Sequence, residues 1–180
     1  MGQEQNVDVT IFAEADDSAD GIAFRLESNL GNGDRLTFEN AKKGDTYRVS
    51  YHLNDGSLGL KFRERPDDAM WVVEGGPCPV SAASDPEFKP IQVSTDGKKL
   101  VVLNKNAFPA KYVYSLRFTK ADGTGIDWDP IIDNRNGGTA LHRVGFLQGC
   151  AIAAGGAVAL LLSALGLRKL IGGKGDDESG

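Results

Sequence analysis

The residues with the clearest potential for chemistry are three carboxylates, Asp127, Asp129 and Asp133. Carboxylate oxygens are ligands that Ca²⁺ takes in proteins, often on loops at the end of a sandwich. In one extended strand the three would share a face, because successive side chains alternate, and that face can equally be the solvated one. We therefore name them as candidate metal ligands and expect no bound cofactor.

A second acidic segment has the spacing of a calcium-binding EF-hand loop. Five residues hold the first, third, fifth, sixth and twelfth positions of such a loop: Asp16, Ser18, Asp20, Gly21 and Glu27. An EF-hand needs a helix on each side, whereas the segments 7–13 and 22–26 alternate like strands. We interpret the segment as an acidic hairpin loop.

Nucleophilic or acid–base catalysis has little support. His52 and His142 are the histidines of the chain, and Cys78 and Cys150 are its cysteines. His52 points outward on a predicted strand, and no base stands near Cys78 in sequence. The usual hydrolase, zinc-protease, Cys-x-x-Cys and phosphate-loop motifs do not occur. We predict a protein that is not an enzyme, with unpaired thiols that favour a reducing compartment.

A long apolar segment stands near the C-terminus. Residues 144–167 are apolar except for Gln148 and Ser163. A helix over this range is roughly 36 Å long, which is enough to cross a hydrocarbon core of about 30 Å. Arg143 and Arg168 flank it and can reach the headgroups. We predict a single transmembrane helix; the alternative is a helix buried in an oligomer or a large complex.

Small residues recur every four positions along this helix, at Gly145, Gly149, Ala153 and Ala157. This spacing lets two transmembrane helices approach closely. We therefore expect the chain to contact the lipid bilayer and to pack as a homo-oligomer or against a partner membrane protein. The N-terminus has no basic start and no apolar stretch, so it is not a secretory signal. A tail-anchored topology with the β-rich part in the cytoplasm is the simplest expectation.

The elements that must position these residues are short strands. Alternating apolar runs predict strands over residues 7–13, 22–27, 35–38, 47–53, 58–62, 69–73, 91–94, 100–103, 112–118 and 126–132. Asp-Gly and Asn-Gly pairs between the runs favour tight hairpins. Residues 74–90 contain several prolines and are expected to form a long loop, with Phe88 as its aromatic residue.

These patterns predict an all-β fold, an antiparallel β-sandwich of Ig-like or jelly-roll-like type, followed by the C-terminal helix. The chain divides into a β-domain over 1–134, a polar hinge over 135–143, the helix over 144–167 and a charged tail over 168–180. The net charge of −5 excludes a typical nucleic-acid-binding protein, which needs a basic face.

Residues 128–134 read Trp-Asp-Pro-Ile-Ile-Asp-Asn and close the predicted β-domain. In this motif the chain resembles a family of small uncharacterised bacterial proteins with an Asp-Pro/Glu-Pro (DP-EP) label. The resemblance covers about the first three quarters of the chain, which has no Glu-Pro dipeptide. It implies a bacterial or phage-related source and carries no activity or site residue.

The sequence thus favours a membrane-anchored, non-enzymatic β-sandwich that acts as a structural or protein-interaction module and self-associates. One alternative is a minor structural protein of a lipid-containing virion. Another is a module that binds Ca²⁺ or a small ligand through end loops such as 75–90.

Overall fold

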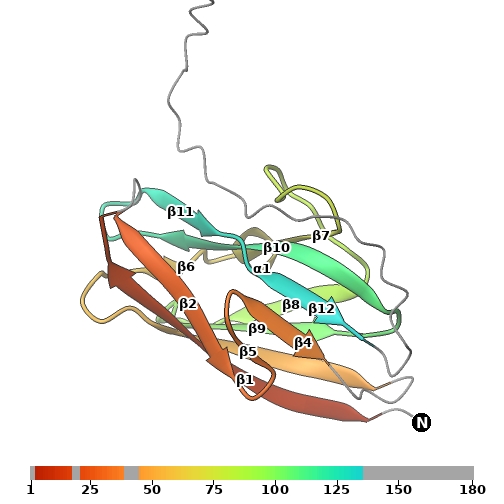
Figure 1. Ribbon diagram of the computed structural model, residues 1–180. Helices are drawn as coiled ribbons and strands as arrows, with labels where there is room; N and C mark the ends of the chain where they lie inside the picture. Colours follow the sequence, from red (N-terminus) through yellow and green to blue (C-terminus); the bar gives the residue numbers. More distant parts are fainter. Residues whose placement is uncertain (1–2, 18–20, 39–44, 136–180) are drawn as a thin grey trace, which may run out of the picture.

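A computed structural model describes residues 3–17, 21–38 and 45–135 of the chain. They form two mixed six-stranded sheets that pack together as a sandwich (Figure 1). One short helix, α1 (Pro66–Ala69), lies beside them. No helix in these three ranges is long and apolar enough to cross a membrane.

The predicted membrane helix over 144–167 lies outside the described residues, and so does its packing face of Gly145, Gly149, Ala153 and Ala157. The predicted charged tail and nearly all of the predicted hinge lie outside as well. The domain limits, the anchor and its packing therefore stay predictions.

The first sheet has the strand order β3-β2-β1-β5-β9-β8. Its strands are β1 (Glu4–Ala15), β2 (Ile22–Ser28), β3 (Gly31–Gly33), β5 (Thr46–Asn54), β8 (Phe88–Val93) and β9 (Lys99–Asn104). β1 and β5 are parallel, from the pair Glu4 and Thr46 to the pair Phe12 and Asn54. The expectation of a wholly antiparallel sandwich is therefore wrong here. After β3 the chain leaves this sheet to form β4 in the other sheet, and it returns as β5 on the free side of β1, parallel to it.

The second sheet is built around β10 (Ala110–Thr119), which pairs with four other strands. The others are β4 (Arg35–Phe38), β6 (Lys61–Phe62), β7 (Met70–Glu74), β11 (Gly125–Trp128) and β12 (Ile131–Asn134). β6 and β7 lie along one side of β10, and β11 and β12 lie along the other. β4 is parallel to β12, which is a second departure from the antiparallel expectation.

Several predicted elements differ from the structure in their bounds: the predicted strand 58–62 is reduced to β6, and β8 begins inside the predicted loop 74–90. Two further differences have local reasons. The predicted strand 126–132 is divided into β11 and β12 around Pro130, which has no N–H to donate to a ladder. The predicted turn at Gly31 and Gly33 forms the short strand β3. A Cβ at Gly31 would lie 2.1 Å from the carbonyl oxygen of Arg35, so only glycine fits there.

The core lies between the sheets, as the alternating pattern predicts. Tyr51 and Tyr114 face each other across it with ring centroids 6.1 Å apart, and burial raises the pKa of both hydroxyls. A second contact between the two sheets is polar. The amides of Asn104 in β9 and Asn134 in β12 exchange two hydrogen bonds, of 2.9 and 3.1 Å, and both residues are buried. This pair fixes the register of one sheet against the other at one end of the sandwich.

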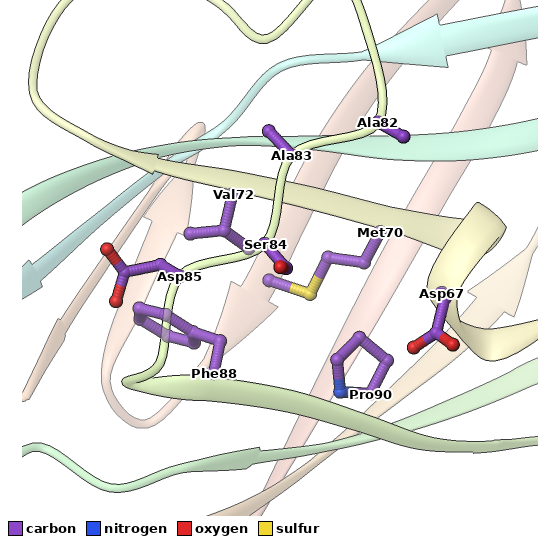
Figure 2. A pocket seen from close by; sticks show the side chains of 9 residues that line it. All are labelled: Asp67, Met70, Val72, Ala82, Ala83, Ser84, Asp85, Phe88 and Pro90. Atoms are coloured by element: carbon purple, nitrogen blue, oxygen red, sulfur yellow. The ribbon is translucent and has the colours of Figure 1, made fainter.

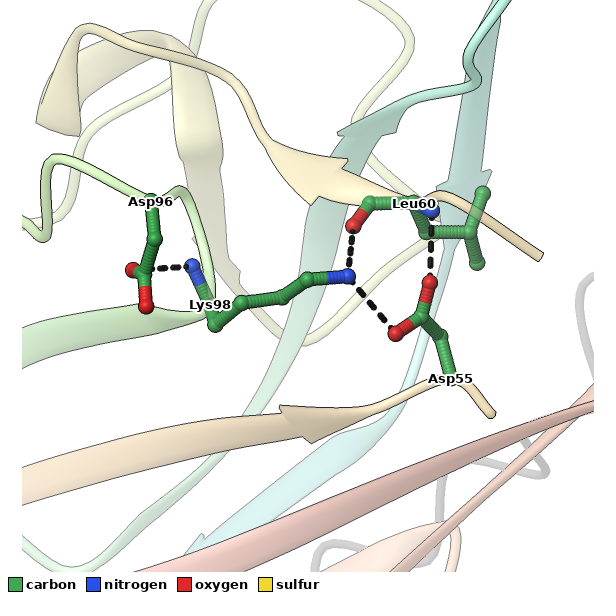
Figure 3. A network of polar contacts seen from close by, with 4 residues as sticks. All are labelled: Asp55, Leu60, Asp96 and Lys98. Carbon is green, nitrogen blue, oxygen red and sulfur yellow. Dashed lines mark hydrogen bonds and ion pairs between the residues drawn. The ribbon is translucent and has the colours of Figure 1, made fainter. Parts of the chain in front are cut away.

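A charged network fixes the connection from β5 to β6, where the chain passes between sheets (Figure 3). The carboxylate of Asp55 accepts hydrogen bonds from the Leu60 N–H and from Lys98 Nζ, each at 2.6 Å. Lys98 Nζ also donates to the Leu60 carbonyl at 2.6 Å. Because Lys98 comes from the turn between β8 and β9, the network ties three segments together.

Candidate functional site

The structure gives Asp127, Asp129 and Asp133 separate roles. Asp127 in β11 accepts hydrogen bonds from Arg117 Nε at 3.1 and 3.2 Å. Asp133 in β12 is buried and pairs with Arg135 at 3.0 Å. Burial raises the pKa of the Asp129 carboxyl, the charge of Asp127 adds to the rise, and the nearby Ser115 hydroxyl opposes it.

Two of the three carboxylates, those of Asp127 and Asp133, therefore already have an arginine as an ion-pair partner. Among the described residues, no three His, Cys, Asp or Glu side chains come close enough together to hold a metal ion. The structure does not bring the three candidate ligands into one cluster, and their role as metal ligands stays a prediction.

The acidic segment with EF-hand spacing connects two strands. Its flanks are β1 and β2, which pair as an antiparallel hairpin, and the Asp16 N–H donates to the Gly21 carbonyl at 3.1 Å. Glu27 lies in β2 and pairs with Arg25. Ser18 and Asp20 lie outside the described residues. The flanking strands agree with the interpretation as a hairpin and not as helix–loop–helix.

His52 points outward from β5, as predicted. Its Nε2 lies 3.0 Å from Asp8 Oδ1 on the outer face of the first sheet, and both side chains are well exposed. Cys78 is disulfide-bonded, so the expectation of a free thiol at this position is wrong. His142 and Cys150 lie outside the described residues.

A cleft of about 360 Å³ lies between the edge strands β7 and β8 (Figure 2). Met70 and Val72 line it from β7, and Phe88 and Pro90 line it from β8. The connecting segment 75–87 runs beside it and contributes the stretch 82–85. This volume is at the lower end of the range for pockets that hold small ligands.

The walls of the cleft are held by backbone hydrogen bonds. The Val72 N–H donates to the Ala83 carbonyl at 3.1 Å, which attaches the connecting segment to β7. Asp85 Oδ1 accepts the Glu87 N–H at 2.8 Å, and the Asp85 carbonyl accepts the Phe88 N–H at 3.0 Å. This turn leads directly into β8, so the cleft keeps its shape at that end.

Carboxylates stand at both ends of the cleft. In Figure 2, Asp85 and Asp67 lie on opposite sides of Met70, Val72 and Phe88. Further residues near the cleft also carry negative charge. Burial, followed by the charges of Asp85, Glu87 and Glu74, raises the pKa of the nearby Tyr112 hydroxyl. The cleft therefore has an apolar floor and a negative rim.

Three large apolar side chains are exposed in the described residues, one in β8 and the others on connections that flank β8 and β9 in the chain. They are Val80 (93% exposed), Ile91 (38%) and Phe108 (67%). Ile91 lies in β8 at an irregularity between Pro90 and Gln92, where a β-bulge re-aims side chains. Val80 is on segment 75–87, and Phe108 follows Ala107, whose N–H donates to Glu87 Oε2 at 2.7 Å.

One side of the cleft, with Met70 and Val72, lies in the predicted strand 69–73, whereas the other side lies on residues 74–90, which the sequence predicts as a loop. Phe88 was expected on the loop 74–90, but it begins β8, is buried and packs edge-on against Tyr112 with centroids 4.8 Å apart. Pro90 is tolerated in β8 because β8 is an edge strand. The alternation of Phe88, Lys89 and Pro90 was the available signal.

No protein-family model matches the chain, and no curated protein matches it either.

Proposed function

We propose that the chain is a membrane-anchored, non-enzymatic interaction module that contacts a protein partner through the β8 side of its sandwich. The observation that carries this proposal is the exposure of three large apolar side chains: Ile91 in β8, Val80 on the segment 75–87 that leads into β8, and Phe108 on the β9–β10 connection, which the hydrogen bond from Ala107 to Glu87 holds near the start of β8. Exposed apolar side chains that gather on one side of a domain mark a protein or membrane contact more often than scattered ones do.

A protein is the better partner for this side than the surface of an anionic membrane. Asp67 and Asp85 line the adjacent cleft, and the whole chain carries a net charge of −5. Anionic headgroups attract basic clusters and repel acidic ones. An aromatic residue such as Phe108 in the centre of a contact is typical of protein interfaces.

The anchor in this proposal is the apolar segment 144–167, which is long enough to cross a bilayer. Its small residues Gly145, Gly149, Ala153 and Ala157 would form the packing face for a second copy or a partner helix. A disulfide at Cys78 favours an oxidising compartment, in contrast to the predicted cytoplasmic side. Because Cys150, the other cysteine of the sequence, lies within the proposed anchor, this proposal requires that Cys78 pair with a cysteine of a second copy or of the partner. Protease protection of the β-domain in sealed vesicles decides the side.

The finer fold type, Ig-like or jelly-roll-like, also belongs to the proposal. It is supported by the order of the strands, because the chain passes repeatedly between the two sheets, as Greek-key sandwiches do. The two parallel pairs are features that those folds would have to accommodate.

Site-specific photo-crosslinking in native membranes tests the interaction surface. A benzophenone amino acid replaces Ile91 or Phe108 in the full-length chain, and the same residue at the exposed Thr124, on the connection from β10 to β11, is the matched control. We expect a defined crosslinked product from positions 91 and 108 but not from 124. Equal labelling at all three positions, or none at any, would contradict the proposal. A product of twice the chain mass identifies a second copy.

A further inference from the structure

We propose that Cys78 forms a disulfide with Cys78 of a second copy, so that the partner of this chain is the chain itself, in a parallel covalent dimer. This inference rests on the proposed function, because it takes the anchor from it and names the partner. Three observations support it: Cys78 is disulfide-bonded, it lies near the point where the chain leaves for the anchor, and the nearby Val80 is exposed.

The bonded state of Cys78 requires a second cysteine. The other cysteine of the sequence, Cys150, is the seventh residue of the proposed anchor 144–167, about 9 Å along the helix from its start. Hydrocarbon disfavours the ionised thiolate, which is the form that attacks a disulfide. A second copy supplies a cysteine in the same surroundings as Cys78, whereas an unrelated partner would need a cysteine of its own at the matching position.

Cys78 lies at the end of the sandwich from which the chain leaves for the anchor. The Gly75 N–H donates to the Lys111 carbonyl in β10 at 2.9 Å. On the other side of β10, Asn134 at the end of β12 pairs with Ala110. Gly75 and Asn134 therefore flank the start of β10 and are roughly 10 Å apart, at a strand spacing of about 4.8 Å. Three residues lead from Gly75 to Cys78, a reach of at most about 10 Å.

The connection to the anchor keeps this end of the sandwich near the bilayer. Residues 136–143 separate the described part of the chain from the anchor, and eight residues span at most about 29 Å when fully extended. β1 alone, with its 12 residues, is roughly 40 Å long. Two chains whose anchors pack through Gly145 and Gly149 would therefore hold their Cys78 segments at a high effective concentration.

The residues beside Cys78 favour a contact with another chain. Pro77 and Pro79 have no backbone N–H, so this stretch is a poor strand for the edge of a sheet to recruit. Val80, two residues from Cys78, is 93% exposed. In a dimer with a two-fold axis a residue meets its own copy only on that axis, so the disulfide places the axis at Cys78. The two Val80 side chains then lie close to the axis, where they can cover each other from water.

The proposed bond forms by thiol–disulfide exchange. The two Cys78 thiols together lose two protons and two electrons, and one S–S bond forms between them. The disulfide of a thiol–disulfide oxidant accepts the electrons and protons and becomes a dithiol, so the exchange balances. Such oxidants act in the oxidising compartment that a disulfide at Cys78 favours.

The test uses the full-length chain in native membranes, with free thiols alkylated before the membranes are dissolved. Electrophoresis without a reductant then compares the parent with Cys78→Ser and with the matched control Cys150→Ser. We expect a product of twice the chain mass from the parent and from Cys150→Ser, and only the single chain from Cys78→Ser. Mass spectrometry of a non-reduced digest should find the Cys78 peptide joined to its own copy.

A longer connection tests the contribution of the anchor. A Gly-Ser insertion that doubles the length of the connection 136–143 should slow the return of the disulfide about threefold after reduction and re-oxidation in detergent micelles. The reason is that effective concentration falls roughly as the −3/2 power of linker length. The same insertion after Gly180 is the control and should leave the rate unchanged. Equal rates for the two insertions would overturn the arrangement in which the anchors bring the copies together.

The outcomes separate this inference from the proposed function. A Cys78–Cys150 peptide from the single chain, or a disulfide to a different protein, would overturn the inference. If positions 91 and 108 then still crosslink to a protein of another mass, the interaction module stands. A disulfide-linked dimer without crosslinks from 91 or 108 supports the inference and removes the proposed contact on the β8 side. If neither product forms, both fail.

Discussion

Asp55→Ala should be among the most destabilising single changes in the sandwich. The side chain of Asp55 is 7% exposed and holds both the Leu60 N–H and Lys98 Nζ at 2.6 Å. Asp55→Ala leaves the N–H of the fully buried Leu60 without a partner and removes the anion that pairs with Lys98. The connection between the sheets then loses its main tie.

The magnitude follows from the two contacts. A buried N–H left unpaired costs about 2 kcal/mol. The lost ion pair adds about 1 kcal/mol, a discounted figure, since Lys98 is 34% exposed and still donates to the Leu60 carbonyl. The sum is about 3 kcal/mol. At about 4 °C per kcal/mol for a domain of this size, we expect a midpoint roughly 12 °C lower.

Tryptophan fluorescence during urea and thermal unfolding measures the effect in the full-length chain. The two tryptophans, Trp71 and Trp128, both lie in the sandwich, so the signal reports on this domain even in detergent. Asp55→Asn is the matched control, because an amide oxygen can still accept the Leu60 N–H. We expect it to cost only about 1 kcal/mol, for the lost charge.

A double-mutant cycle with Lys98→Met isolates the ion pair, and its coupling energy should be about 1 kcal/mol. The reasoning is refuted if Asp55→Ala costs less than about 1 kcal/mol, or if it costs no more than Asp55→Asn, since the buried N–H would then carry no penalty.

Four further results are expected. Asn104→Ala should lower the urea midpoint by the equivalent of about 2 kcal/mol, because it leaves the buried Asn134 amide without its partner; an unchanged midpoint would contradict this. Gly97→Ala should cost clearly more than Gly123→Ala in thermal unfolding, although both have positive φ, since only at Gly97 would the new Cβ meet a side chain, at 2.7 Å. Because burial raises the pKa of Asp129, its protonated form contributes stability below about pH 4, and this contribution is lost as the pH rises through the raised pKa. Asp129→Asn should therefore raise the melting temperature relative to the parent at pH 7 but not at about pH 3.5. Cys78 should resist alkylation in unfolded protein until a reductant is added, and mass spectrometry of the peptide that contains it checks this.

Much of the sandwich could be predicted from alternation. The runs around Tyr51 and Tyr114 place every second residue in the core, and the structure has strands there with those faces buried. Pairing could not be predicted in the same way, because period-two alternation says which face a residue occupies and not which strand lies beside it. The parallel pair of β1 and β5 follows from the path of the chain, which no local pattern encodes.

The candidate site was harder to predict than the fold. The sequence favoured Asp127, Asp129 and Asp133 as metal ligands because of their residue type and spacing alone. In the structure, Asp127 pairs with Arg117 and Asp133 pairs with Arg135. The cleft combines Met70 with Phe88, residues that are separated by a segment with several prolines. Only the packing of two edge strands brings them together, so sequence spacing gave no sign of it.

The central place of β10 has a consequence for the order of events during synthesis. β6 and β7 are made well before β10, and within the described residues they pair with no other strand. The second sheet therefore cannot begin to assemble until residues 110–119 are available, and the apolar inner face of the first sheet stays uncovered until then. Such late, non-local closure is slow and exposes a nascent chain to aggregation. Any fragment that ends before β10 would retain β4, β6 and β7 but lack the strands with which they pair, so truncation from the C-terminal side should remove the fold abruptly and not gradually.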